Sequence, residues 1–191
     1  MNAKPKRLRI ALLGAGAMGR MHAAAYAQMP EVERLDVPAR DADRVRAVTT
    51  ELMTFDLDFA NWLMGKPARV WAAGTGEITA LLDYGDRSAT IAVSGLMPPG
   101  SPFTAGFRAL FEQAVFELQQ VFRGGPPDIA FTIAVGRTPP QPVDLAGGNP
   151  YEIELRRFAD CIAGNADPAL LDADRAIESL ELSLAVQRAR R

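Results

Sequence analysis

Apolar and polar positions follow the periods of helices and strands along most of the chain, and they predict an α/β protein. In the first third, short apolar runs alternate with Ala-rich or charged stretches. This pattern predicts a strand, a helix, a strand and a helix in turn, at residues 7–13, 17–29, 32–37 and 41–49. Residues 51–64 then place large apolar side chains three and four positions apart and stop before Gly65, which predicts an amphipathic helix.

Antiparallel sheet is expected in the middle of the chain. The segments 78–84 and 89–96 flank the turn Gly85-Asp86-Arg87, which is a β-hairpin signal, and residues 128–135 predict another strand. Residues 107–122 are ambiguous, because their apolar positions fit a helical period while their aromatic and β-branched content also suits strands. The pattern alone favours a helix there.

Two helices are expected in the last quarter of the chain. Residues 137–149 contain three prolines and two glycines, so they predict a surface connection without regular structure. Residues 151–162 predict a helix that ends at Gly164-Asn165, and Asp172 is the expected N-cap of a final helix.

The composition excludes several classes of protein. The 191 residues are 48% hydrophobic, enough for a buried core, and the net charge of -2 gives no basic excess that would indicate nucleic acid or an anionic membrane as a partner. One Cys and one His provide no disulfide framework and no zinc cluster, so no metal site is expected. The longest uncharged stretch, residues 88–107, contains three prolines and three glycines and predicts no membrane span. A lone Cys without a targeting signal favours the cytoplasm.

Charge is distributed unevenly along the chain. Residues 1–50 carry nine Lys or Arg and five Asp or Glu, whereas residues 51–191 carry twelve and eighteen. The change near residue 50 predicts a boundary between a small N-terminal unit, residues 1–50, and a larger domain, residues 51–191.

The sharpest local signal is a G-x-G-x-x-G motif at the junction of the first predicted strand and helix. It comprises Gly14, Ala15, Gly16, Ala17, Met18 and Gly19. In a dinucleotide-binding loop the first glycine permits the turn, the second lets the backbone approach a pyrophosphate, and the third lets helix and strand pack closely. The helix N-terminus also attracts phosphates, so these six residues are predicted to bind a dinucleotide. The alternative is an Ala/Gly-rich tight turn that binds nothing.

The residue beside the adenosine ribose would decide between NAD and NADP. An acid is expected about 20 residues after the loop, but Ala39 and Arg40 stand there. A small neutral residue beside an Arg suits a 2′-phosphate and favours NADP, while the equal alternative is that Arg40 is one more solvated charge. Asp36 and Asp41 are the acids available as substitutes.

Other polar residues have simpler explanations. His22, on the first predicted helix, is expected to pack or to cap rather than to catalyse, and Cys161 is expected to be a small core residue. Asp56, Asp58 and Asn61 are expected to form the solvated face of their helix.

Three stretches of sequence carry a family resemblance. The first runs from Arg9 to Tyr26 with the spacing G-x-x-G-x-x-H-A, the second from Leu57 to Pro67, and the third from Tyr151 to Asp160. Together they resemble the Gfo/Idh/MocA family, named after glucose-fructose oxidoreductase and inositol dehydrogenase. The resemblance implies an NAD(P)-binding Rossmann domain followed by an α/β domain, whose open antiparallel sheet binds a sugar or polyol and packs subunits together. It also implies that residues 107–122 are strands.

The chain departs from the family pattern in both parts. Only 36 positions separate Gly14 from Thr50, which admits a partial Rossmann unit of the βαβ type but not a sheet of about six strands. The family's Glu-Lys-Pro motif, whose Lys contacts cofactor and substrate, is absent. In the family an acid precedes the proton-transferring His by four residues. Here Glu51 matches the acid, but Phe55 replaces the His and cannot exchange a proton.

The sequence therefore supports two hypotheses, both with a partial Rossmann unit followed by an α+β domain with a mostly antiparallel open sheet. The first is an NAD(P)-dependent oxidoreductase of the Gfo/Idh/MocA type that acts on a sugar or polyol, through a shortened chain or one completed by another polypeptide. The second is a catalytically inactive remnant that serves as an oligomerisation or small-ligand-binding module. We expect a homo-oligomer joined through the C-terminal sheet. The N-terminal unit should pack on its own larger domain or on another subunit, because an incomplete sheet leaves exposed edges.

Overall fold

The structure is a computed structural model that describes residues 8–11, 17–30, 32–36, 52–98, 100–145 and 147–190. The chain divides into two compact units. Unit 1 comprises Met1–Leu96 with Asn149–Arg191, and unit 2 comprises Met97–Gly148. The boundary predicted at residue 50 lies outside the described residues and stays a prediction.

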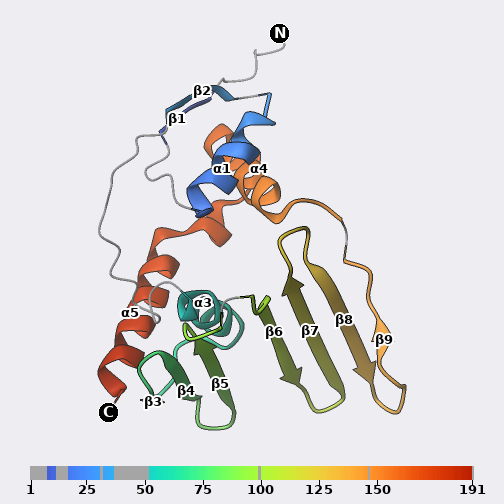
Figure 1. Ribbon diagram of the computed structural model, residues 1–191. Coiled ribbons are helices and arrows are strands. Elements are labelled where there is room, and N and C mark those ends of the chain that lie inside the picture. Colours follow the sequence, from blue (N-terminus) through green and yellow to red (C-terminus); the bar gives the residue numbers. More distant parts are fainter. Residues whose placement is uncertain are drawn as a thin grey trace. The chain divides into compact units, whose positions relative to one another are not determined.

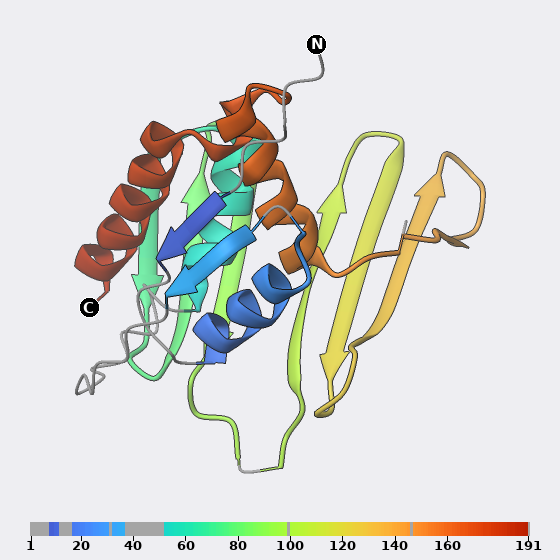
Figure 2. The same ribbon diagram turned by 90° about the horizontal axis from the view of Figure 1, so that it is seen from above.

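The N-terminal segment is a pair of parallel strands joined by a helix. Strand β1 (Leu8–Ala11) pairs with β2 (Val32–Asp36), and α1 (Ala17–Ala27) connects them. Figure 2 shows the two strands running in the same direction. Parallel strands need such a crossover because the chain has to return to its starting end before it can pair. The predicted βαβ unit is therefore present, while the helix expected at residues 41–49 lies outside the described residues.

Helix α1 packs on α4 (Pro150–Ala163), which comes from the far end of the chain. Figure 1 shows the two helices side by side. Their contact is a buried cluster of Ala25, Tyr26, Met29, Leu155 and Ala159. The expectation that the N-terminal unit packs on the rest of its own chain is confirmed at this contact.

The ends of α4 follow the local signals in the sequence. The Asn149 side chain accepts a hydrogen bond from the Tyr151 N–H and caps the start of the helix. Gly164 ends it at a φ of 77°, in the left-handed region that favours glycine. The 3-10 helix η1 (Pro168–Leu171) then leads to α5 (Ala173–Ala189), which begins at the predicted N-cap Asp172.

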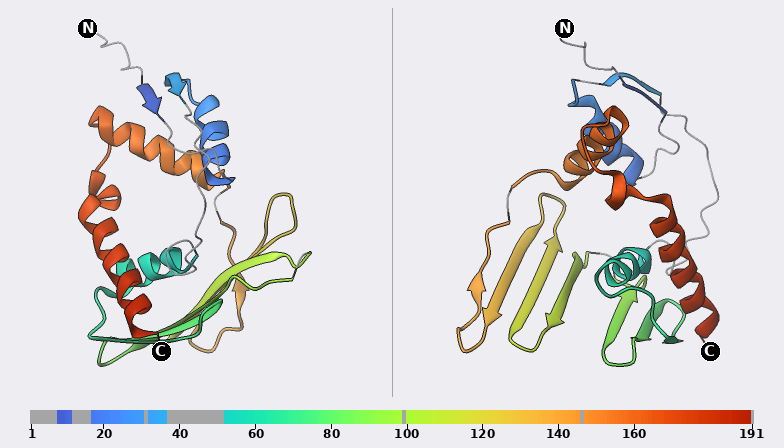
Figure 3. Two further views of the ribbon diagram at one scale, coloured as in Figure 1. Left: turned by 60° about the vertical axis from the view of Figure 1, so that its left-hand side comes forward. Right: turned by 180° about the vertical axis from the view of Figure 1, so that it is seen from behind.

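The main core of unit 1 lies between a three-stranded antiparallel sheet and two helices. The sheet contains β3 (Arg69–Ala73), β4 (Glu77–Asp83) and β5 (Ser88–Ser94) in that order. Helices α3 (Met53–Met64) and α5 lie on the same side of it, as Figure 3 shows. The predicted helix and hairpin are confirmed, whereas β3 is an addition that the pattern did not predict.

Large apolar side chains from the sheet and from both helices meet in this core. Met53 and Leu57 of α3, Ile78 and Leu82 of β4, and Val186 of α5 are fully buried. Along β4 every second residue is buried, as expected for a strand with one face on a core. Burying one Leu side chain contributes about 1.5–3 kcal/mol, so this cluster dominates the stability of unit 1.

Unit 2 is a four-stranded antiparallel sheet. Strands β6 (Phe103–Leu110), β7 (Ala114–Phe122), β8 (Asp128–Val135) and β9 (Gln141–Pro142) follow one another in space. The segment 107–122 therefore forms parts of two strands, as the family resemblance implies, and the helix favoured by its apolar period is wrong. Cross-strand pairing decides its structure, because every residue of β6 has a partner in β7.

Two further details of unit 2 concern backbone conformation. A Cβ atom at Gly106 would lie 2.2 Å from the Leu118 carbonyl oxygen, so glycine is required where β6 approaches β7. Strand β9 lies in the connection 137–149, which was expected to lack regular structure. It is short because three prolines in this segment limit the available backbone N–H donors.

We expect Leu57→Ala to lower the free energy of unfolding by about 2–5 kcal/mol, because it leaves a cavity among fully buried side chains. Urea unfolding followed by circular dichroism measures the change. Leu63→Ala on the exposed side of the same helix is the control and should cost less than about 1 kcal/mol. Equal losses in the two variants would contradict the core assigned to α3.

Candidate functional site

The predicted dinucleotide loop falls between β1 and α1. Gly14, Ala15 and Gly16 lie outside the described residues, and Ala17, Met18 and Gly19 form the first turn of α1. The motif thus joins the carboxyl end of a parallel strand to the N-terminus of the following helix, where dinucleotide-binding folds hold the pyrophosphate. The first turn of α1 contains no acidic residue that would oppose an anion.

This arrangement suits the pyrophosphate of NAD(P). In the described residues it does not provide a place for the nicotinamide. A nicotinamide lies in the crevice between two mononucleotide-binding halves. Within the described ranges, the parallel sheet consists of β1 and β2 and corresponds to the start of one half. Arg40 and Asp41 lie outside these ranges, and Asp36 is the last residue of β2.

The start of α3 carries the positions that the family resemblance assigns to proton transfer. Glu51 lies outside the described residues, and the ring of Phe55 is 64% exposed. Next to it, Asp56 is half-buried, and burial raises the pKa of its carboxyl above the ordinary value. A carboxyl with a raised pKa is a candidate proton-transfer group. The sequence placed Asp56 on a solvated face, because a helical period does not reveal how deeply a flanking polar side chain is buried.

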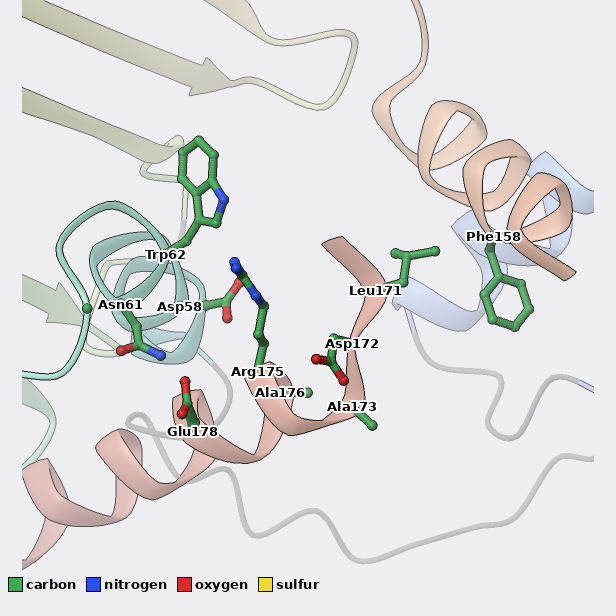
Figure 4. Close-up of a pocket in the computed structure, with 11 residues that line it drawn as sticks. Asp58, Asn61, Trp62, Phe158, Leu171, Asp172, Ala173, Arg175, Ala176 and Glu178 are labelled. Atoms are coloured by element: carbon green, nitrogen blue, oxygen red, sulfur yellow. The ribbon is translucent and has the colours of Figure 1, made fainter. Parts of the chain in front are cut away.

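A pocket of about 810 Å³ opens where α3 faces η1 and the start of α5. Figure 4 shows the side chain of Arg175 extending from α5 toward Asp58 and Trp62 of α3. The apolar lining comes from Trp62, Phe158, Leu171, Ala173, Ala176 and Gly65, and the polar lining from Asp58, Asn61, Asp172, Arg175 and Glu178.

The acids of this pocket have structural partners. Asp58 accepts a hydrogen bond from the Ser179 hydroxyl, and Asp172 accepts one from the Asp174 N–H at 3.1 Å. The Glu178 carboxylate lies 3.3 Å from the Lys66 ammonium. The pocket therefore presents an amide, a guanidinium and aromatic surface, which can bind a small polar molecule. The described residues that line it include no Ser, Cys or His, and so no hydroxyl or thiol nucleophile paired with a histidine base.

The one histidine and the one cysteine of the chain have packing roles. The ring of His22 packs edge-on against Tyr151 of α4, with ring centroids 5.7 Å apart, as a packing residue would. Cys161 is half-buried rather than part of a core cluster, and its Sγ lies 3.5 Å from the Asp167 carbonyl oxygen.

The part of the chain that the structure describes contains no helix long and apolar enough to cross a membrane. The same residues contain no group of three or more His, Cys, Asp or Glu side chains placed to hold a metal ion.

No model of a known protein family matches the chain, and no curated protein matches it. Solved structures do match. UDP-N-acetylglucosamine 3-dehydrogenase from Acidithiobacillus ferrooxidans is similar, with a TM-score of 0.61 and 20% identity over 80% of this chain and 50% of that chain. A protein described as the oxidoreductase YvaA of Bacillus subtilis matches with a TM-score of 0.54 and 16% identity over 78% of this chain and 52% of its own.

A third structure, from Klebsiella pneumoniae and described as an oxidoreductase, has a TM-score of 0.54 and 14% identity over 73% of this chain and 46% of its own. The chain thus spans about half the length of the structures it matches. The likeness shows the fold, and the predicted α/β class is confirmed: a parallel β1–β2 unit together with an antiparallel sheet of four strands.

We expect Asp56→Asn to be more stable than the parent protein at pH 7. Burial raises the folded-state pKa of Asp56 above the ordinary value of 3.8, so the charged carboxylate destabilises the fold once the pH exceeds that value. The gain should vanish as the pH falls below about 3.8, where the carboxyl is protonated in both states. Urea unfolding at several pH values measures it.

Asp160→Asn, at an exposed position of α4, is the matched control and should change stability little. A stability change in Asp56→Asn that does not depend on pH would refute burial as its cause.

Proposed function

We propose that this chain is a Gfo/Idh/MocA-type derivative that acts through self-association, with its C-terminal sheet joining copies into a homo-oligomer. The three motif stretches and the fold shared with oxidoreductase structures support this ancestry. The observation that carries the proposal is the composition of one face of the sheet in unit 2.

Alternate residues of each strand share a face, and the pairing register aligns these faces across β6, β7 and β8. One face, here called the apolar face, contains a single polar side chain, Gln120. Its members are Phe103, Ala105, Phe107, Ala109, Ala114, Phe116, Leu118, Gln120, Phe122, Ile129, Phe131, Ile133 and Val135. The opposite face is mixed and includes Arg108 and Glu117, whose charged groups lie 3.9 Å apart.

Aromatic rings form a connected surface on the apolar face. The ring centroids of Phe103 and Phe122 are 5.5 Å apart, and Phe131 lies 6.5 Å from both Phe107 and Phe116. Phe103 and Ile129 nevertheless remain exposed, and the described residues of unit 2 include no helix that covers this face. An apolar area of this kind indicates an interaction surface. A second copy of the same sheet matches it, because two sheets pack face to face about 10 Å apart and a dimer with twofold symmetry uses the same patch twice.

We expect Ile129→Lys to weaken self-association strongly, because it places a charge within the apolar face. Light scattering coupled to size-exclusion chromatography measures the mass of each species. Leu110→Lys changes an exposed apolar residue on the opposite face and is the matched control, which should associate as the parent does. A parent protein that stays monomeric at about 100 µM would overturn the proposal, since stable interfaces form well below that concentration.

A second candidate function is that of an NAD(P)-dependent oxidoreductase of the cytoplasm that acts on a sugar or polyol. A separate observation supports it. The location of the glycine motif between β1 and α1 favours a pyrophosphate site at Gly14 to Gly19, and Arg40 suits a 2′-phosphate. When bound, NAD(P) would supply hydride transfer. Because Phe55 cannot move a proton, this function requires proton transfer by another group, and Asp56 is the described carboxyl with the matching change in pKa.

Titration with NADPH and NADH by calorimetry tests this second function. We expect NADPH to bind more tightly than NADH, and Arg40→Ala to remove the difference, because the variant lacks the positive charge that suits a 2′-phosphate. The NADH affinity of the Arg40→Ala protein is the internal control, because NADH has no such phosphate. Absence of binding at millimolar nucleotide would exclude the second function and leave the self-association proposal standing.

A further inference from the structure

Helix α5 carries apolar residues on the side opposite to the core. Its buried side chains, Ser179, Leu182, Ser183 and Val186, face α3 and the three-stranded sheet. On the other side Ile177, Leu180 and Leu184 are exposed. We call these three residues together with Ala173 the α5 seam. A surface helix normally carries polar residues there, so the α5 seam needs an explanation.

The spacing of the α5 seam is that of a helix that packs along another helix. Its members follow one another by four, three and four positions, as do the a and d positions of a coiled coil. Residues with this spacing stay on one stripe of the helix over its whole length. The partner that fits such a stripe is a second helix with the same pattern.

The distribution of charge along α5 favours a second copy of α5 as the partner, in antiparallel orientation. Residues 172–181 contain four acids and one Arg, and Lys66 lies within 3.7 Å of two of these acids, Glu178 and Glu181, so this end of α5 keeps a net negative charge. Residues 182–190 contain two Arg and no acid. Two copies of α5 in parallel would bring like charges together at both ends. In the antiparallel arrangement, the acidic start of one copy lies beside the basic end of the other, so the charges are complementary.

We propose that the α5 seam binds the α5 seam of a second copy of this chain in antiparallel orientation. The twofold axis passes close to Leu180, and Ile177 packs against Leu184 of the partner subunit. Asp174 then lies near Arg188 of the partner subunit. This interface differs from the apolar face of unit 2 and does not depend on the function proposed for that face.

A single helix pair makes a small interface, so the dimer is expected to be weak and concentration-dependent. Sedimentation equilibrium measures its association constant. Leu180→Glu places a charge at the centre of the α5 seam and should lower that constant by about tenfold or more. Ile153→Glu on α4 is the matched control, since Ile153 is 56% exposed and Leu180 is 50% exposed. It should leave the constant within about twofold of the parent value.

Cysteine cross-linking tests the orientation and separates this interface from the sheet interface. In a Cys161→Ser background, chains with Ile177→Cys are mixed with chains with Leu184→Cys and oxidised mildly. A disulfide requires Cα atoms within about 7 Å, so the antiparallel pair predicts a disulfide between the two variants and little in either variant alone.

The result that supports the proposal is this mixed disulfide together with the loss of association in Leu180→Glu. Disulfides formed within each variant alone would indicate a parallel pair and overturn it. Absence of disulfide in every mixture would also overturn it, whatever the sheet face does. Circular dichroism of each variant establishes that the chain is folded in the comparison.

Discussion

The packing of α3 and α5 against each other and on one side of the three-stranded sheet is the contact on which unit 1 depends. Leu57 and Val186 are both fully buried there, although they come from opposite ends of the domain. The Ser179 hydroxyl bonds to Asp58 across 121 positions of sequence, and Ser183 Oγ lies 3.4 Å from Thr54 Oγ1. Sliding one helix along the other would break both contacts and leave each hydroxyl only the carbonyl four residues before it, so the contacts favour one register of the helix pair. That register also determines which residues of each helix face outward.

The helices and the hairpin could be predicted because their signals are local. Gly65 and Gly164 end two helices, Asp172 starts a third, and Gly85 stands in the hairpin turn. Strand β3 has a local signal that the pattern analysis missed, because Gly74 and Gly76 stand in the short turn that joins it to β4. A bridge between Ala72 and Arg190 also ties β3 to the far end of the chain. The strands at 107–122 depend on their cross-strand partners, since their apolar spacing fits a helix until these partners are considered.

The candidate site likewise has a part that local sequence signals predict and a part that depends on contacts between distant residues. The glycine motif was found from its spacing alone, because strand, turn and helix are consecutive in sequence. The pocket was not found, since Trp62 and Arg175 stand more than a hundred positions apart and meet only through the packing of α3 on α5. Asp58 and Asn61 were assigned to a solvated face; Asp58 is exposed, and both residues also line this pocket. Periodicity indicates which side of a helix is polar, but it does not indicate what lies opposite.

Strand β9 limits how the sheet of unit 2 can grow. An exposed outer strand is a template for further strands, and repeated addition of this kind leads to amyloid. Here the outermost strand is Gln141–Pro142, preceded by Pro139 and Pro140, and a proline has no N–H to offer to an incoming strand. The side-chain Nε2 of Gln141 moreover donates a hydrogen bond of 3.0 Å to the Pro139 carbonyl oxygen, just before β9. Addition of a further strand at the Gln141–Pro142 edge is therefore disfavoured, although the apolar face beside it is rich in phenylalanine.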